Sequence, residues 1–283
     1  IFGSGYLAAI GIIPALVGKG DLVLADKLIH ASLLDGIAVS KAKMIRFFHN
    51  DIENANKILD HHRDKFNKLL IITETIFSMD GDCGKIQELL DLAKKFKGIL
   101  LSDDAHGLGL IKENYNDESH LQMGTFSKSV GGYGGYLCAK AEIVDYLRNF
   151  SKSAIYTTAL PPAILAGNLA ALKIITKDKK LRKKALNNSK YFCELMNFSV
   201  VESAIVIILI DDNKKVMEIA NIVKDKGFLI SAIRQPTVAT ARLRITFNSN
   251  PSQRVENPRN LAIFLFISGG YLDLAFFQFI LLH

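Results

Sequence analysis

Cysteine and proline are scarce in this chain, and no low-complexity tract interrupts it. Its 283 residues include three cysteines and six prolines. Cys83, Cys138 and Cys193 lie far apart and form neither a CxxC pair nor a metal-ligand spacing, so we expect no disulfide framework and no metal site. The low proline content, with 49% hydrophobic and 22% charged residues, excludes a disordered chain and is typical of a globular protein.

A secretory signal is also missing, and the basic charge has no nucleic-acid motif beside it. The chain starts at Ile1 in a glycine-rich turn, so we expect a fragment that begins inside a domain, and a cytoplasmic location. The net charge is +7, but the densest basic cluster, residues 177–184, is interpreted as one solvated helix face. Without aromatic or recognition motifs, this charge does not predict nucleic-acid binding.

One apolar run, residues 261–283, has the length of a membrane span. Asp273 and the pair Gly269-Gly270 interrupt this run, and no basic residue follows it. We interpret the run as a hydrophobic core element or a divergent tail. A membrane-associated protein is the alternative interpretation.

Short apolar runs alternate with helical patterns between residues 20 and 140. The expected strands are residues 22–25, 44–47, 69–73, 99–102, 121–126 and 136–139, and the expected helices are residues 51–59 and 86–96. Several strands are continuously apolar, as in a sheet buried on both faces. The alternation predicts an α/β fold with a mostly parallel central sheet and helices on both faces. Functional sites in such sheets form at the carboxyl ends of the strands.

The second half of the chain changes in character. Residues 141–186 have a helical pattern, and two further strands and a helix are expected at residues 204–210, 242–246 and 216–226. This pattern is typical of a smaller α+β domain. We therefore expect a large domain over residues 1–175 and a small one over residues 176–283.

Reactive side chains follow two of the expected strands. Lys128 comes after residues 121–126, and burial at a strand end would lower the pKa of its amine, as Schiff-base chemistry requires. An exposed loop lysine is the alternative. Asp103, Asp104 and His106 follow residues 99–102. They suit acid–base chemistry, a metal ion, a cofactor ring or a helix cap.

Three further segments carry weaker signals. Residues 3–6 form a glycine-containing turn before a helical stretch, where free N–H groups bind phosphate. Ser78 follows the strand at residues 69–73, and residues 80–82 are interpreted as a tight turn because the other ligands of a calcium loop are missing. His30 follows the first expected strand, and a lone histidine is more often structural than functional.

Together these segments resemble the α-oxoamine synthases, a family of acyltransferases that depend on pyridoxal phosphate. The segments are SGYLA, DKLIHASLLDG, FHND, TETIFSMDGD, DDAHG, GTFSK, YGGYLCA, TTALPP and AIRQPTV…ARLRIT. They match in order over roughly residues 3–247. The resemblance implies the pyridoxal-phosphate-dependent transferase fold of the aspartate-aminotransferase type.

The resemblance also implies a role for each matching residue. Lys128 would carry the cofactor and move the α-proton of the substrate. Asp103 would pair with the pyridine nitrogen and His106 with the phenolic oxygen, while His30 would stack on the ring and help to position substrate. The other cofactor contacts that it implies are those of Ser78 and, at phosphate groups, Gly5, Tyr6, Thr125 and Thr158.

The implied partners are a second copy of the chain and two small molecules. Thr158 would reach the phosphate of the partner subunit, which implies a homodimer. Thr237 would contact substrate, and Arg244 would bind the carboxylate of the amino acid. Strand alternation turns Arg242 to the same face, so spacing alone does not choose between these arginines. The implied reaction is the decarboxylative condensation of L-alanine with pimeloyl-CoA, or its carrier-protein equivalent, to 8-amino-7-oxononanoate in biotin synthesis.

The sequence departs from the family at both ends. A segment that contacts substrate and precedes Ser4 in the family is absent, and an unrelated apolar tail follows from about Asn248. We therefore expect a truncated or divergent copy that keeps the fold and the cofactor residues. The alternatives are another pyridoxal-phosphate activity of the aminotransferase class and an inactive remnant of the fold.

Overall fold

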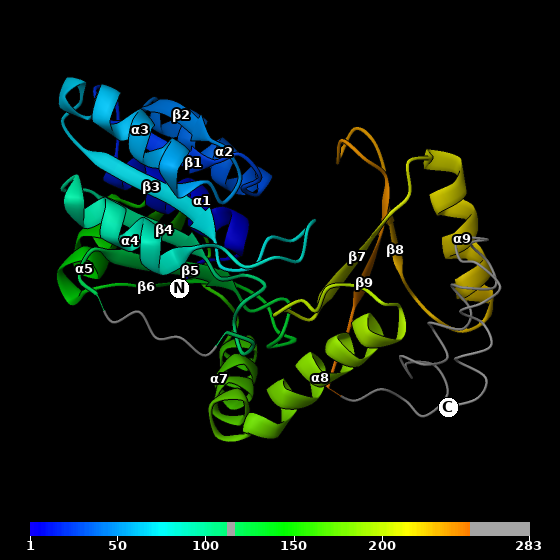
Figure 1. Cartoon of the computed structure of the whole chain (residues 1–283). Helices are drawn as coiled ribbons and strands as arrows, with labels where there is room; N and C mark the ends of the chain where they lie inside the picture. The colour runs from blue at the N-terminus through cyan, green and yellow to red at the C-terminus, as the bar shows by residue number, and fades with distance from the viewer. Residues whose placement is uncertain (112–116, 250–283) are drawn as a thin grey trace. The chain divides into compact units, whose positions relative to one another are not determined.

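A computed structural model describes residues 1–111 and 117–249, which form two compact units (Figure 1). The first unit comprises residues 1–77 and 83–177, and the described part of the second comprises residues 78–82 and 178–249. The apolar run at residues 261–283 lies outside the described residues. None of the helices in the described ranges combines the length and the apolarity that a membrane crossing requires.

A six-stranded sheet forms the centre of the first unit. Its strands are β1 (Leu22–Asp26), β2 (Lys43–Phe47), β3 (Leu69–Glu74), β4 (Ile99–Asp103), β5 (His120–Thr125) and β6 (Gly135–Cys138). They lie in the order β2-β1-β3-β4-β5-β6, and only the β5–β6 pair is antiparallel. The mostly parallel α/β sheet predicted from the sequence is therefore confirmed.

Alternation along the strands divides the core between the two faces of this sheet. On β1, Val23 and Ala25 pack in one apolar cluster, whereas Leu22 and Leu24 pack in the other. The first cluster is covered by α1 (Gly5–Leu16) and α2 (Ala31–Ser40), and the second by α3 (Ile52–His62) and α4 (Ile86–Lys95) (Figure 1). Strand β2 is different because most of its side chains are at least partly exposed at the edge of the sheet.

The remaining elements of the first unit are helical. The 3-10 turn η1 (Arg63–Lys65) follows α3, and after β6 come α5 (Ala141–Phe150), α6 (Lys152–Ile155) and α7 (Pro162–Lys177). The helical pattern of residues 141–186 is thus divided into several helices. Pro161 and Pro162 precede or begin α7, where proline is tolerated because the first helical N–H has no partner.

The second unit is an antiparallel sheet with two helices. Strands β7 (Ile205–Leu209), β9 (Arg242–Thr246) and β8 (Ser231–Ile233) pair in that order, with α8 (Lys179–Leu195) and α9 (Asn213–Asp225) supplying apolar faces to one core. The tight turn at residues 78–82 packs here. Gly81 has φ +74°, and a Cβ on it would lie 2.5 Å from the Ile205 carbonyl oxygen, so the turn requires glycine.

Candidate active site

The carboxyl ends of β1, β3, β4 and β5 meet at one edge of the first unit, because these strands are parallel. Lys128 follows β5 and His106 follows β4, and Lys128 Nζ lies 2.8 Å from His106 Nε2. Lys128 and His30 both lie close enough to the Asp103 carboxyl group to influence its pKa electrostatically. The structure therefore brings together the four residues that were expected to be catalytic.

Asp103 ends β4 and is buried. Desolvation raises the pKa of its carboxyl group, while the Ala105 N–H, 2.9 Å from Oδ1, and the charges of Lys128 and His30 oppose that shift. This N–H is the one hydrogen-bond donor to the carboxyl group among the described residues. A protonated pyridine nitrogen is a donor that fits the second oxygen and favours its ionised form.

Lys128 itself is exposed, so of the two environments that its segment left open the structure has the exposed loop. Strand β5 already ends at Thr125, and Lys128 stands in the turn that follows. Burial is therefore not the physical reason for its reactivity. What marks Lys128 as a site residue is its contact with His106 and its charge near Asp103.

The start of α1 lies against the end of β5. A Cβ on Gly5 would be 3.2 Å from the Thr125 Cβ, and Phe2 pairs with Gly135 on the neighbouring strand. Ser4 caps the helix by accepting a hydrogen bond from the Leu7 N–H at 3.0 Å. The N–H groups of the first helical turn have no partner within the helix, so this corner suits a phosphate. The structure thus brings Gly5 and Thr125 together, and the phosphate contacts expected of Gly5, Tyr6 and Thr125 stay a prediction.

Ser78, Thr237 and the two arginines belong to the second unit. Arg242 is 8% exposed, and its Nη1 donates to Asp80 Oδ1 at 2.6 Å and to the Met79 carbonyl at 2.9 Å. Arg244 donates from Nε to the Ser78 carbonyl at 2.6 Å and pairs with no carboxylate among the described residues. Thr237 is exposed in a turn. The structure thus distinguishes the two arginines: Arg242 already holds a carboxylate.

The pattern of a known family matches most of the chain. A profile described as "Aminotransferase class I and II" matches residues 1–257. The chain belongs to that family.

Curated relatives and solved structures show which members of that family the chain resembles. The 8-amino-7-oxononanoate synthases of Granulibacter bethesdensis and Methylorubrum extorquens are each 43% identical to it, over 88% of this chain and 67% and 65% of their own lengths. A solved serine palmitoyltransferase of Sphingomonas wittichii has a TM-score of 0.88 at 26% identity, over 95% of this chain and 71% of that one. The chain therefore spans about two thirds of the length of the curated relatives that it matches.

A solved 8-amino-7-oxononanoate synthase from Francisella tularensis aligns with a TM-score of 0.78 at 27% identity, over 96% of this chain and 82% of that one. Another solved relative carries pyridoxal phosphate. The chain has the fold of the pyridoxal-phosphate-dependent transferases and is an α-oxoamine synthase by relationship, as the sequence motifs indicated. Pyridoxal phosphate is the cofactor of this family.

Next to Asp103, a second buried acid, Asp104, bonds to two residues that the sequence did not identify as its partners. Asp104 is buried, and its two oxygens accept hydrogen bonds from Thr75 Oγ1 at 2.7 Å and from the Tyr136 hydroxyl at 3.2 Å. Burial raises the pKa of Asp104 to about 6, and burial also raises the pKa of Tyr136. The acid links the residue after β3 to a residue of β6, and neither of these hydrogen bonds involves its neighbour Asp103.

Asp104 should make the stability of the apoprotein depend on pH. Asp104 keeps its proton in the folded chain up to a pKa of about 6, whereas in the unfolded chain it releases the proton near its ordinary pKa of 3.8. The folded state therefore binds more protons in this interval, and the free energy of unfolding should fall as pH rises from 3.8 to about 6, by about 3 kcal/mol. Urea unfolding of wild type and Asp104→Asn across this range measures the effect. If the free energy of unfolding of Asp104→Asn falls with pH as steeply as that of the wild type, the assignment to Asp104 is contradicted.

His30 has a structural role as well as its expected cofactor role. Its Nδ1 caps α2 by accepting a hydrogen bond from the Ser32 N–H at 3.2 Å, and it lies 2.8 Å from Ser32 Oγ. The residue is exposed near the end of β1, so the ring stays accessible. Thr158 is exposed between α6 and α7, and its expected contact with the partner subunit stays a prediction.

Proposed function

We propose that this chain condenses L-alanine with a pimeloyl thioester, with loss of carbon dioxide, to give 8-amino-7-oxononanoate. The observation that carries the proposal is the contact of Lys128 with His106 beside the buried Asp103, at the carboxyl edge of the sheet. This arrangement supplies an amine, a histidine and an acid to one cofactor ring. The product of this reaction, 8-amino-7-oxononanoate, is the one for which the curated relatives that are 43% identical are named.

In this proposal, pyridoxal phosphate supplies an electron sink for the charge that develops at the α-carbon of the amino acid. Asp103 holds the proton at the ring nitrogen, and His106 holds the phenolic oxygen. Lys128 Nζ takes the α-proton, and its 2.8 Å contact with His106 Nε2 orients the amine.

The remaining expected site residues bind rather than transfer protons. His30 covers the ring and excludes water. The N–H groups of Gly5 and Tyr6, with the Thr125 hydroxyl and the expected contact of Ser78, hold the cofactor. Thr237 contacts substrate.

We also propose that the active form is a homodimer in the cytoplasm and that Thr158 reaches the phosphate of the partner subunit. The exposure of Thr158 and of Tyr156, which is 81% exposed, supports a contact at this segment. An acyl-CoA and an acyl carrier protein are the two candidate thioester donors. Sedimentation of the purified chain with cofactor measures the oligomeric state, and a monomer would contradict the dimer.

Acyl-dependent release of carbon dioxide tests the function. Purified chain with pyridoxal phosphate is given carboxyl-labelled L-alanine, with and without pimeloyl-CoA or the corresponding carrier-protein thioester. We expect label to leave as carbon dioxide only when the thioester is present. Amino-group transfer to a keto acid without thioester would favour the alternative aminotransferase activity. Cofactor binding with neither reaction would identify an inactive remnant.

Arg244 is expected to bind the carboxylate of the amino acid. Its guanidinium pairs with no acid among the described residues, so Arg244→Ala should raise the KM for L-alanine about a hundredfold. It should cost less stability than Arg242→Ala, because it leaves the Ser78 carbonyl without its donor but no carboxylate. Arg242→Ala should instead lower the melting temperature, because it leaves Asp80 and the Met79 carbonyl without their donor. Steady-state kinetics and thermal unfolding of both variants separate these roles. An increase in KM in Arg242→Ala alone would reverse the assignment.

A further inference from the structure

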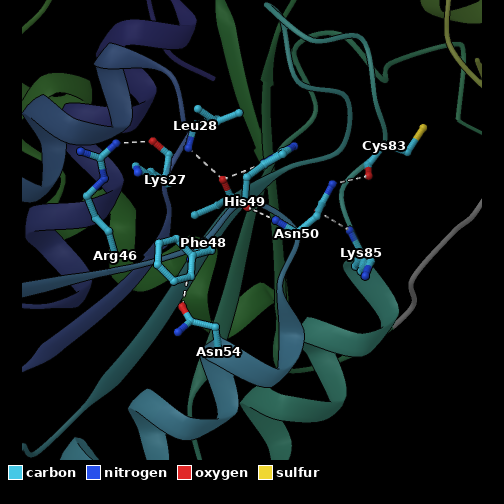
Figure 2. A network of polar contacts seen from close by, with 10 residues as sticks. Lys27, Leu28, Arg46, Phe48, His49, Asn50, Asn54, Cys83 and Lys85 are labelled. Atoms are coloured by element: carbon cyan, nitrogen blue, oxygen red, sulfur yellow. Dashed lines mark hydrogen bonds and ion pairs between the residues drawn. The ribbon is translucent and has the colours of Figure 1, made fainter. Parts of the chain in front are cut away.

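Two loops at the site edge of the first unit are joined by one buried carboxylate that the proposed chemistry does not use. Asp26 ends β1, and its side chain is fully buried. Its Oδ1 accepts a hydrogen bond from the Leu28 N–H at 2.8 Å, in the loop that follows β1. The same carboxylate accepts from the Asn50 N–H at 2.9 Å and lies 3.0 Å from His49 Nδ1, in the loop that follows β2 (Figure 2).

Asn50 and His49 extend this network to the segments that follow β3. Asn50 has φ +53°, and its side chain donates to the Cys83 carbonyl at 3.0 Å and accepts from the Lys85 N–H at 3.3 Å (Figure 2). The His49 ring meets the buried ring of Phe77 edge-on, with 4.4 Å between the centroids. Moving the carboxylate would therefore disturb the ends of three neighbouring strands.

The turn that Asp26 shapes is the one that presents His30. After the Leu28 contact, the Ile29 N–H approaches the Asp26 carbonyl at 3.4 Å, and the His30 carbonyl accepts the first hydrogen bonds of α2. The His30 ring is exposed, and within the described part of the chain its hydrogen bonds are to Ser32 alone. The backbone of residues 26–30 therefore sets where the ring stands.

We propose that Asp26 is a positioning residue that, with His49 and Asn50, fixes the turn presenting His30 to the cofactor. The inference rests on the proposed function, in which His30 covers the cofactor ring. Asp26 touches neither cofactor nor substrate. Hydrogen bonds to a buried carboxylate are strong, and a fully bonded buried network holds one geometry. Such supporting contacts determine how firmly a binding residue is held.

Asp21 offers a matched control at the opposite end of the same strand. It directly precedes β1 and is buried, and its carboxylate accepts hydrogen bonds from the Gly18 N–H at 2.9 Å and the Lys68 N–H at 3.1 Å. Asp21→Asn and Asp26→Asn therefore make the same chemical change in two similar buried carboxylates. Only one of them lies at the site edge.

We expect Asp26→Asn to weaken the affinity for pyridoxal phosphate about tenfold, and to change the visible circular dichroism of the bound cofactor. Asp21→Asn should change neither. Because Asp26 acts through His30, the double variant Asp26→Asn/His30→Ala should bind the cofactor about as weakly as His30→Ala alone. Fluorescence titrations measure affinity, and thermal unfolding of each variant shows how much stability it loses.

Equal cofactor affinity in Asp26→Asn and Asp21→Asn would overturn the inference, as would additive effects of Asp26→Asn and His30→Ala. If Asp26→Asn does not fold, His49→Phe replaces it, alone and combined with His30→Ala, in the same double-mutant comparison. That variant removes one contact to the carboxylate and keeps a ring against Phe77. A wild-type chain that folds without binding the cofactor would contradict the proposed function, and the inference with it. If the wild type binds the cofactor normally but the single and double variants do not behave as expected, only the inference about Asp26 is overturned, and the proposed function stands.

Discussion

Lys128→Ala should abolish the covalent attachment of pyridoxal phosphate and lower turnover on the order of 10³-fold or more. This variant would lose two functions at once, because in the proposed function the same amine carries the cofactor and takes the α-proton of the substrate. The neighbouring His106, 2.8 Å from the amine in the wild type, remains in place, so the loss belongs to the amine. Borohydride reduction followed by peptide mass analysis should find the label on the wild-type peptide that contains Lys128.

Lys19→Ala is the control for this experiment. Lys19 is an exposed lysine in the turn before β1, at the opposite edge of the sheet from the site. It should keep the yellow absorbance of the lysine-linked cofactor and the turnover of the wild type. A label on another lysine, or turnover in Lys128→Ala equal to that of the wild type, would refute the assignment.

Asp103→Asn should lower turnover about 10³-fold while part of the cofactor affinity remains. An amide of the same size lacks the charge that keeps the ring nitrogen protonated, so the developing negative charge loses its acceptor. The apoprotein should not lose stability at neutral pH. Burial raises the pKa of Asp103, which means that its ionised form is costly in the fold, and the neutral amide removes that cost.

Asp104→Asn is the matched comparison for Asp103→Asn. Its carboxyl group is bonded to Thr75 and Tyr136, so we place it outside the reacting groups and expect it to keep most of the turnover. Steady-state kinetics of the two variants with bound cofactor measure turnover, and thermal unfolding of the two apoproteins measures stability. Greater loss of turnover in Asp104→Asn than in Asp103→Asn would show that the two acids have been assigned in the wrong order.

Continuous apolar runs were enough to locate most of the sheet. The runs in β1 and β3 are buried on both faces, so no polar alternation obscures them, and the expected strands agree with the structure within one or two residues. Helix α2 was not identified because its segment, ASLLDGIAVS, mixes serine, glycine and β-branched residues, which are poor helix formers. Strand β8 was also missed, since it is three residues long and only partly buried.

The order of motifs along the chain also determined the family and the cofactor. A residue at the end of a parallel strand must lie at the site edge whichever strand stands beside it, and Asp103 and His106 follow this rule. The same rule brought Lys128 to the edge but left open whether its side chain is buried or exposed. How far a side chain projects beyond its strand depends on the following turn, and this one leaves the lysine exposed.

Only the tertiary structure decided which acids and bases are in contact. The register that pairs Glu74 with Asp103 also brings Thr75 to Asp104, and the antiparallel return of β6 adds Tyr136. The sequence alone determined the strands of the central sheet, the family and the residues that follow those strands, because local sequence patterns reveal continuous burial and the order of motifs. It could not determine the long-range partners of Asp26, Asp104 and Arg242, which are His49 and Asn50, Thr75 and Tyr136, and Asp80, because these come from segments distant in the chain that only the tertiary structure brings together.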